Sequence, residues 1–374
     1  MIHTTYNVKL DAARYDIVVG KNLLPGTLVE NLNRKTKNKK VVVVFDSFLR
    51  NTPLCRTVCA ALKQHGYEAY PYRLRSGKQN KNIQNVIDLY EFLEIKGLSR
   101  DSTLVAFGGG VVGDLVGFVA STYLRGINFI NIPTTLMAMV DSSIGGKVAV
   151  NFHKRINAIG NYYHPMVNII DLDFLKSLPE RDFWSGLAEI IKCAAIADAK
   201  LFEYLRTHVK EITAQREQDL FYIMSRAIEI KLDHVKGDVR EQGKRLKLNY
   251  GHTLGHAVEI STEHADIYRH GEGVSLGMVG AAYIAEKYFK KRGVLKAHED
   301  ILSKYGLPVA IDTRTMKNEY RGLLKRCIEN VQRDKKKKNN RLRFVLCRNI
   351  GQCGVYSDIR GALVENAFRY LIHK

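Results

Sequence analysis

The sequence predicts two domains: an α/β amino-terminal domain built on a parallel β-sheet, followed by a mainly α-helical carboxy-terminal domain. A chain of 374 residues usually forms more than one hydrophobic core. The first half alternates short apolar runs with helical patterns, which is typical of a parallel sheet. From Ser177 to about residue 330 nearly all of the periodicity is helical. We therefore expect one domain over residues 1–177 and a second over residues 178–374.

The first domain is expected to begin with one strand within residues 1–20, where Tyr6, Val8 and Leu10 alternate with polar neighbours. A run of valines ending at Phe45 is typical of a strand buried on both faces. Further strands are expected at residues 67–74, 103–107, 128–132 and 167–171, with helices after residue 46, over residues 82–95 and after residue 107.

The second domain is expected to begin with a helix at residues 177–180, Ser-Leu-Pro-Glu. The serine would cap the helix, the proline would occupy its first turn, and the glutamate follows three residues after the serine. Near the end of the chain come a basic run at residues 333–338, an alternating segment at residues 342–346 and a final helical pattern.

Composition and charge limit the partners of the protein. The net charge of +20 attracts anions, whether phosphorylated metabolites, nucleic acid or acidic membrane surfaces, and argues against a cationic substrate. No run reaches the roughly 18 apolar residues that a membrane helix needs, so we expect no membrane segment. The six cysteines form no CxxC pair and no secretory signal is visible, which predicts a cytoplasmic protein without disulfides.

A glycine-rich turn at residues 108–114 (Gly-Gly-Gly-Val-Val-Gly-Asp) follows an expected strand and opens an expected helix. Glycines let the backbone approach a pyrophosphate, and a helix amino terminus adds free N–H groups and positive potential. An acidic residue, Asp46, ends an earlier strand. The pattern predicts a Rossmann-like dinucleotide site, and the alternative interpretation is a simple tight turn.

Two charged residues stand out in the segment that follows. Asp141 lies in an otherwise apolar helical stretch, where a carboxylate is costly to bury without a partner. Lys147 follows a Gly-Gly turn and could bind an anion or handle a proton. The alternative interpretation is a salt bridge between the two.

Two histidines, His252 and His256, are four residues apart, which places both imidazoles on one face of a helix. Histidine is both a common metal ligand and a common proton carrier. A joint metal site and a pair of packed or solvated histidines are both open at this point. Glu189, one turn before Lys192, could join His252 and His270 in the His₂Glu set typical of catalytic zinc.

The chain resembles the 3-dehydroquinate synthase family of sugar-phosphate cyclases over almost its whole length. The matching motifs are residues 108–114, 123–126 (Tyr-Leu-Arg-Gly), 132–136 (Ile-Pro-Thr-Thr-Leu), 141–147 (Asp-Ser-Ser-Ile-Gly-Gly-Lys), 178–181 (Leu-Pro-Glu-Arg), 186–192 (Gly-Leu-Ala-Glu-Ile-Ile-Lys), 249–256 (Asn-Tyr-Gly-His-Thr-Leu-Gly-His) and 270–272 (His-Gly-Glu). The resemblance implies a dehydroquinate synthase-like fold and a step of the shikimate pathway to aromatic amino acids.

The activity that the resemblance implies is an NAD-assisted, metal-dependent cyclisation of a seven-carbon heptulosonate phosphate. It proceeds by transient oxidation with NAD, phosphate elimination, reduction and intramolecular aldol closure. The implied metal is divalent, zinc or alternatively cobalt, and would polarise a substrate oxygen.

The resemblance also implies roles for individual residues. It makes Glu189, His252 and His270 the metal ligands and places His256 beside the substrate phosphate. Catalytic roles are implied for Lys147, Asp141, Lys192, His256 and Asn249, substrate binding for Arg125, Asn157, Lys231, Arg245 and Lys336 (or adjacent Lys335), and cofactor binding for Asp46, Lys81, Gly109, Gly110, Asp114, Thr134 and Thr135. Arg125 would reach into the neighbouring subunit's site, which implies a homodimer.

Two departures from the family pattern leave other interpretations open. The lysine that the family has beside Asn157 is Ile156 here, and an acidic residue of its nucleotide segment is Lys78, which would favour additional negative charge on the cofactor. The alternatives are a cyclase of the 2-deoxy-scyllo-inosose, amino-dehydroquinate or sedoheptulose 7-phosphate type, a metal-dependent polyol dehydrogenase, and a non-catalytic or nucleic-acid-binding relative. Because Arg245, Asn249 and His256 keep the family pattern, a substrate with a carboxylate is the first choice.

Overall fold

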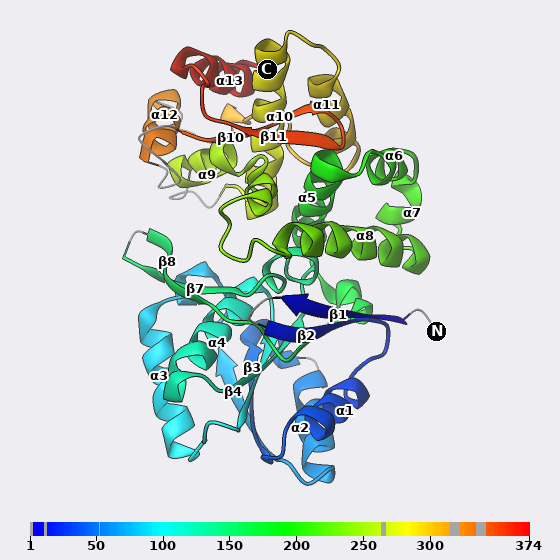
Figure 1. The fold of residues 1–374 in the computed structure, drawn as a ribbon, viewed down its shortest axis with the longest axis vertical. Helices are drawn as coiled ribbons and strands as arrows, with labels where there is room; N and C mark the ends of the chain where they lie inside the picture. Colours follow the sequence, from blue (N-terminus) through cyan, green and yellow to red (C-terminus); the bar gives the residue numbers. More distant parts are fainter. Residues whose placement is uncertain are drawn as a thin grey trace. The chain divides into compact units, whose positions relative to one another are not determined.

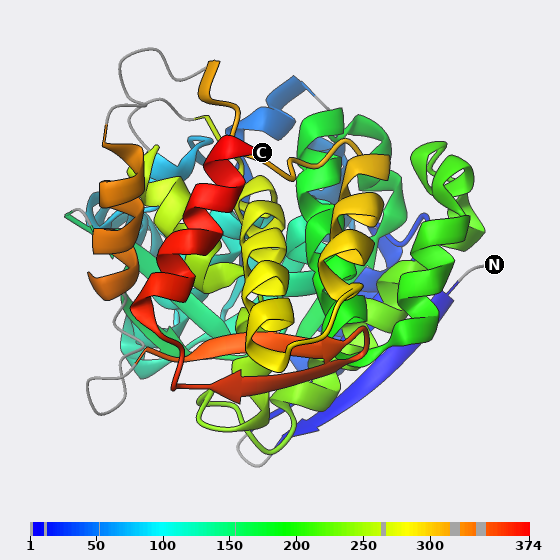
Figure 2. The same cartoon turned by 90° about the horizontal axis from the view of Figure 1, so that it is seen from above.

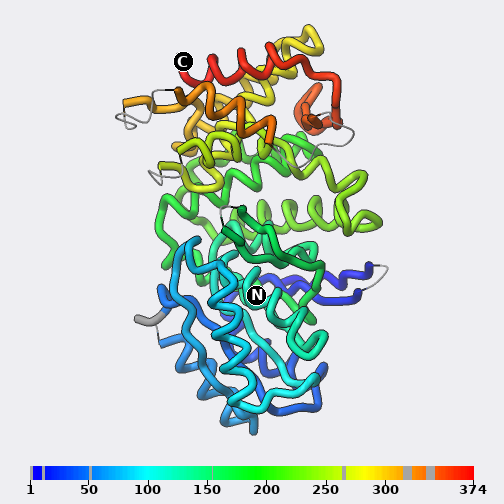
Figure 3. The backbone as a smooth tube through the Cα atoms, turned by 90° about the vertical axis from the view of Figure 1, so that its left-hand side faces the viewer, coloured from blue at the N-terminus to red at the C-terminus, as the bar shows by residue number. Residues whose placement is uncertain are grey.

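The computed structural model describes residues 3–10, 13–51, 53–153, 155–262, 267–314, 322–333 and 342–374. The chain divides into two compact units, Met1–Leu178 and Pro179–Lys374, and its path through each can be followed in Figure 3. Among the described helices, none is both long enough and apolar enough to cross a membrane.

The first unit is built on a seven-stranded sheet in the order β1-β2-β9-β6-β5-β3-β4 (Figure 1). Its strands are β1 (His3–Leu10), β2 (Ala13–Gly20), β3 (Lys40–Asp46), β4 (Glu68–Leu74), β5 (Thr103–Gly108), β6 (Asn128–Pro133) and β9 (Val167–Asp171). β1 and β2 pair antiparallel, and the other pairs of the sheet are parallel, so the predicted parallel α/β class is confirmed. The single strand expected within residues 1–20 is wrong, because the alternating pattern runs through two strands.

Helices cover both faces of this sheet. They are α1 (Gly26–Lys35), α2 (Leu54–Gln64), α3 (Ile83–Ile95) and α4 (Gly110–Thr122). Figure 1 shows α3 and α4 on one side of the sheet and α1 and α2 on the other. Val41, Val42, Val43 and Val44 are fully buried, as expected for a strand covered on both faces. An antiparallel pair that periodicity did not predict, β7 (Lys147–Phe152) and β8 (Arg155–Tyr162), packs two valines into the α3–α4 core.

The carboxyl ends of β3, β5 and β6 meet at one edge of the sheet. The register aligns Phe45 with Phe107 and Phe107 with Ile132. The backbone N–H of Thr134 then donates to the carbonyl of Gly108 at 3.0 Å. Ligands of parallel sheets bind beyond this edge, so the fold gathers Asp46, the glycine turn and the start of the next motif where a ligand is expected.

The second unit is mainly helical, as predicted. Its elements are α5 (Glu180–Ala197), α6 (Ala199–Thr207), α7 (Val209–Thr213), α8 (Glu217–Val235), α9 (His252–Ser261), α10 (His270–Phe289), α11 (Val294–Lys304), α12 (Leu323–Arg333), β10 (Phe344–Asn349), β11 (Gln352–Tyr356) and α13 (Gly361–His373). Figure 2 shows α10, in yellow, between α13 in red and α11 in gold, with the β10–β11 hairpin across one end.

Glycines let the helices around α10 approach closely. A Cβ atom on Gly271 would lie 1.8 Å from the carbonyl oxygen of Ser185 on α5. A Cβ atom on Gly255 of α9 would lie 2.4 Å from the carbonyl oxygen of Gly273 on α10. Real Cβ contacts are never this short, so only glycine permits the approach of α5, α9 and α10 that assembles the candidate site.

Two sequence-based expectations about the second unit are wrong. Helix α5 begins at Glu180 after an extended Pro179, and Ser177 does not cap it, because its hydroxyl donates to the carbonyl of Phe174 at 3.1 Å in the preceding turn. Cys347 and Cys353 form a disulfide. They are cross-strand partners in the β10–β11 hairpin, which brings residues with no CxxC spacing face to face.

Candidate active site

A buried carboxylate lies at the centre of the second unit. Glu189 on α5 forms an ion pair with Lys192 one turn later, and both side chains are only 1% exposed. Burial favours the neutral acid, but the charge of Lys192 and the contact with His270 lower the pKa of Glu189 to about 2. Glu189 is therefore ionised at neutral pH, and a buried anion requires positive or polar partners.

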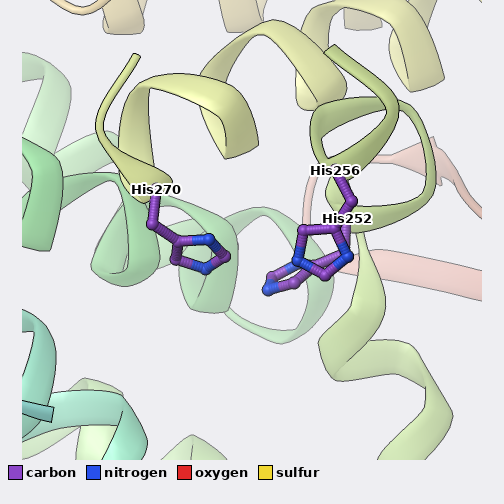
Figure 4. Close-up of side chains that lie close together, drawn as sticks. All are labelled: His252, His256 and His270. Carbon is purple, nitrogen blue, oxygen red and sulfur yellow. The ribbon is translucent and has the colours of Figure 1, made fainter. Parts of the chain in front are cut away.

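Two imidazoles face this carboxylate from two other helices. His252 opens α9 and His270 opens α10 (Figure 4). Their Nε2 atoms lie 3.6 and 3.5 Å from Oε1 of Glu189, respectively. That oxygen is buried and makes no hydrogen bond to any residue that the structure describes. One oxygen and two nitrogens, all suitable metal ligands, therefore converge.

His256 points toward the same place from one turn further along α9 (Figure 4). Ring nitrogens of His252, His256 and His270 lie within 4.8 Å of one another, close enough for all three to hold one ion. The geometry is compatible both with a joint site and with a separate role for His256, so the division of roles between His252 and His256 stays a prediction.

Each histidine that faces Glu189 is held by its other ring nitrogen. Nδ1 of His252 lies 3.1 Å from the backbone oxygen of Tyr250, and Nδ1 of His270 lies 3.1 Å from Oε1 of Glu259. A proton on Nδ1 satisfies both contacts and leaves Nε2 as the ligand atom. Burial lowers the pKa of His270, but Glu189 and Glu259 outweigh this effect and raise that pKa to about 10, so the metal-free ring carries a proton on both nitrogens and a metal would displace the proton on Nε2.

Sequence reasoning missed Glu259 and the buried residues behind Tyr250. Glu259 follows His252 by seven residues and His256 by three, which places it on the same helix face, and this spacing was the available signal. The hydroxyl of Tyr250 lies 3.0 Å from Nε2 of His298, whose Nδ1 lies 2.8 Å from the carbonyl of Val294. Because that carbonyl can only accept, His298 carries its proton on Nδ1 and Tyr250 donates to it.

Two predicted motifs meet at the start of α10. The guanidinium of Arg181 donates to both carboxylate oxygens of Glu272 at 2.7 Å, and the backbone N–H of Arg269 donates to the same carboxylate at 2.8 Å. Motifs 178–181 and 270–272 therefore hold the turn from which His270 projects.

The other residues predicted in the second unit lie on α8 and in the turn Lys244–Asn249, which packs against α5 and α8. Lys231 and Arg245 are 5% and 3% exposed. Arg245 Nη1 donates to the carbonyl of Val239 at 2.6 Å, and the amide of Asn249 donates to Glu241. Lys336 and Lys335 lie outside the described residues.

In the first unit, the predicted cofactor residues gather at the glycine turn. A pocket there is lined by Gly109, Gly110, Asp114 and Lys147, among others. No side chain of a described residue caps α4, so none of these side chains occupies the N–H groups of its first turn. A Cβ atom on Gly109 would lie 3.1 Å from Cγ2 of Thr135.

The end of β3 is held by the carboxylate of Asp46. This carboxylate accepts hydrogen bonds from its own loop, including one from the N–H of Phe48 at 2.8 Å.

Lys81 connects two other predicted residues, Asp114 and Asn157. Its buried ammonium forms an ion pair with Asp114 and donates to the side chain of Asn157. Asn157, expected in the substrate pocket, thus contacts the same lysine as Asp114, which is expected to bind the cofactor.

Asp141 lies half-buried in a π-helical turn, Ala138–Ser142, instead of the expected regular helix. Arg125 is exposed with a φ of 68°.

Comparisons with known proteins define the family. The models of 3-dehydroquinate synthase N-terminal and C-terminal domains match residues 71–185 and 186–337. A 3-dehydroquinate synthase from Idiomarina loihiensis is 39% identical over 358 residues, covering 94% of this chain and 95% of that protein. One from Shewanella halifaxensis is 38% identical over 359 residues, covering 96% and 97%. The chain belongs to the 3-dehydroquinate synthase family.

Solved structures agree with the fold that family membership implies. A 2-epi-5-epi-valiolone synthase from Streptomyces hygroscopicus, solved with NAD⁺ and Zn²⁺ bound, is 26% identical with a TM-score of 0.82, covering 97% of this chain and 98% of that one. A 2-deoxy-scyllo-inosose synthase solved with carbaglucose-6-phosphate, NAD⁺ and Co²⁺ is 24% identical with a TM-score of 0.85, covering 99% and 100%. The predicted dehydroquinate synthase-like fold is confirmed.

Proposed function

We propose that this member of the 3-dehydroquinate synthase family has that activity and converts a seven-carbon heptulosonate phosphate to a carbocycle with loss of phosphate. The observation that carries the proposal is the buried carboxylate of Glu189, with Nε2 of His252 and of His270 at 3.6 and 3.5 Å. Similarity to curated relatives of that name over nearly the whole chain supports the substrate class.

The donor set fits a divalent metal. One carboxylate oxygen and two imidazole nitrogens form the His₂Glu set of catalytic zinc sites that keep an open position. Oε1 of Glu189, buried without a hydrogen bond from any described residue, would gain the partner that it needs. We assign Glu189, His252 and His270 as ligands of zinc, with cobalt as the alternative. When bound, the ion would polarise a substrate oxygen.

The first unit fits NAD. The uncapped start of α4 offers N–H groups to a pyrophosphate, and the glycine turn removes the Cβ atoms that would obstruct it. We assign as its binding residues Asp46, Lys81, Gly109, Gly110, Asp114, Thr134 and Thr135. Lys81 neutralises Asp114, which would otherwise repel the phosphates. NAD would accept a hydride and return it. Lys78, three residues before Lys81, is exposed, so NADP is the cofactor to compare with NAD.

The remaining assignments suit a doubly anionic substrate. Lys231 and Arg245 are cations held inside the second unit, and the planar guanidinium of Arg245 can bind a carboxylate with two hydrogen bonds. Lys192 keeps Glu189 ionised. We assign His256 to the substrate phosphate, Asn157 and Lys336 to substrate binding, and Lys147, Asp141 and Asn249 to positioning and proton transfer.

Phosphate release from the heptulosonate phosphate tests the proposal. Zinc-loaded protein with NAD should release phosphate, lose this activity with a chelator and regain it with zinc. NADH should not accumulate, because a cyclase regenerates its cofactor, whereas net NADH would indicate a polyol dehydrogenase. Release only from sedoheptulose 7-phosphate or glucose 6-phosphate would instead show a sibling cyclase, a candidate suggested by Ile156, which is 57% exposed where the family has lysine.

A homodimer with Arg125 in the partner's site is part of the proposal. Leu124 and Arg125 both have positive φ angles, 50° and 68°, a strained backbone that is often kept for function. Equal mixing of inactive Arg125→Ala and Glu189→Gln subunits should restore about a quarter of the activity, because each mixed dimer has one intact site. Activity that stays at the level of the separate variants would refute the shared site.

A further inference from the structure

The imidazole of His270 lies between two carboxylates. Its Nε2 faces Oε1 of Glu189 at 3.5 Å, and its Nδ1 contacts Oε1 of Glu259 at 3.1 Å. The two carboxylates come from different helices, α5 and α9, while the ring comes from α10. Glu259 is therefore placed to control the proton on Nδ1 and the direction in which Nε2 points.

A gap on α10 makes room for the Glu259 side chain. Three residues after His270, a Cβ atom on Gly273 would lie 2.6 Å from both Cγ and Oε1 of Glu259. The three atoms nearest to that Cβ position all belong to Glu259. The side chain of Glu259, only 14% exposed, thus fills the space that a residue with a side chain would occupy.

His252 and His270 are held by acceptors of different strength. Nδ1 of His252 meets the neutral backbone oxygen of Tyr250, whereas Nδ1 of His270 meets a carboxylate. A carboxylate is the stronger acceptor, and it makes the opposite nitrogen of the ring a more basic ligand. The metal bond of His270 therefore depends on a neighbouring side chain, the Glu259 carboxylate.

We propose that Glu259 is a positioning residue that orients His270 toward the divalent metal and strengthens its bond to the ion, and that Gly273 exists in this sequence to admit the Glu259 side chain. This inference rests on the proposed function, because it requires the metal that we assigned to Glu189, His252 and His270.

Zinc affinity measured by chelator competition tests the role of Glu259 without an activity assay. Glu259→Gln keeps the shape of the side chain and should bind zinc ~10- to 100-fold more weakly than the unmodified protein. Glu299→Gln on α11 is the matched control, because Glu299 is also 14% exposed and also pairs with a cation, Lys374. The zinc affinity of this control should stay within ~2-fold of that of the unmodified protein. The absorption bands of bound Co²⁺ should shift in the first variant and not in the second.

A second variant displaces Glu259 without removing its charge. Gly273→Ala should force the Glu259 side chain away from His270, weaken zinc binding by a similar factor, and keep the far-ultraviolet circular dichroism of the metal-free protein. Because both substitutions break the same contact, the double variant should bind zinc no more weakly than Glu259→Gln alone.

The outcomes separate this inference from the proposed function. Unchanged zinc affinity in Glu259→Gln and Gly273→Ala would overturn the positioning role and leave the proposed activity intact. Additive losses in the double variant would also overturn it, because the two residues would then act independently. An unmodified protein that binds no zinc would overturn both proposals.

Discussion

The glycine turn of the first unit and the histidine centre of the second are built in opposite ways. The turn, residues 108–114, is one continuous segment whose useful groups are backbone N–H groups, and it depends on Cβ atoms that are absent. The histidine centre uses side chains from α5, α9 and α10, and it depends on a balance of buried charges. Substitutions in the turn should act by steric exclusion, whereas substitutions in the centre should act through charge and also change stability.

The difference also shows in how each region is supported. In the first unit the sheet itself aligns the loops, since the register of β3, β5 and β6 fixes where all three strands end. Among the described residues of the second unit no such ladder joins the helices, and individual contacts hold the ligands. Glu259 contacts His270, and Tyr250, which itself contacts His298, contacts His252. Single side chains should therefore matter more in the second unit.

The largest effect is expected for Glu189→Gln. It removes the carboxylate ligand and breaks the buried ion pair with Lys192, and the loss of one partner of such a pair typically destabilises a protein by about 3–5 kcal/mol. We expect loss of bound zinc, phosphate release lower by at least about 10³-fold, and a lower melting temperature. NAD affinity in titrations should not change, since its residues lie in the first unit.

The double variant Glu189→Gln, Lys192→Met separates these effects. Removing the Lys192 cation as well should recover most of the lost stability but none of the zinc binding. If the double variant also binds zinc as the unmodified protein does, Glu189 is not a ligand.

A smaller effect, on stability, is expected at His298 as the pH falls. Burial lowers the pKa of His298 to about 4, below the value of 6.5 in the unfolded chain. Between pH 6.5 and pH 4 the unfolded state therefore binds a proton at His298 that the folded state does not bind. The free energy of unfolding falls progressively over this interval, by about 3 kcal/mol in all.

Urea unfolding of metal-free protein at pH 7 and pH 5 measures this loss. His298→Asn should lose less stability over that interval than the unmodified protein, although it costs about 1–2 kcal/mol at pH 7 through its lost hydrogen bonds. His373→Asn, at an exposed position, is the control and should keep the original pH dependence. An equal pH dependence in His298→Asn and the control would show that His298 is not the titrating group.

The contrast between the two regions also explains what sequence could predict. The buried strand ending at Phe45 and the glycine turn are local patterns, and the structure has both where they were expected. The convergence of Glu189, His252 and His270 came from residue chemistry and family resemblance. Glu259 was missed because periodicity shows that it shares a helix face with His252 but not that α10 packs against that face.

Other misses have the same origin in tertiary structure. The β7–β8 pair and the Cys347–Cys353 disulfide depend on antiparallel pairing, which alternation or cysteine spacing alone does not reveal. Ser177 is a residue type that often caps helices, but its hydroxyl donates to the carbonyl of Phe174 in the preceding turn. Local sequence patterns therefore predicted individual helices and strands. The strand pairing, the disulfide and the hydrogen bond of Ser177 depended on contacts that these patterns do not show.

The smallest of these effects is expected for Gly110→Ala in the first unit. The added methyl group would lie 2.9 Å from Oγ of Ser142, at the glycine turn assigned to NAD. Overpacking of this kind typically costs about 1–3 kcal/mol, so NAD affinity measured by calorimetry should fall by roughly 10-fold while zinc affinity stays the same. Adding Ser142→Ala should restore most of the affinity, because the next atom, Cβ of Ser142, is 3.6 Å away, an ordinary contact. Undiminished NAD affinity in Gly110→Ala would mean that the cofactor does not depend on the missing Cβ atoms, and the distinction between a backbone site and a side-chain site would not hold.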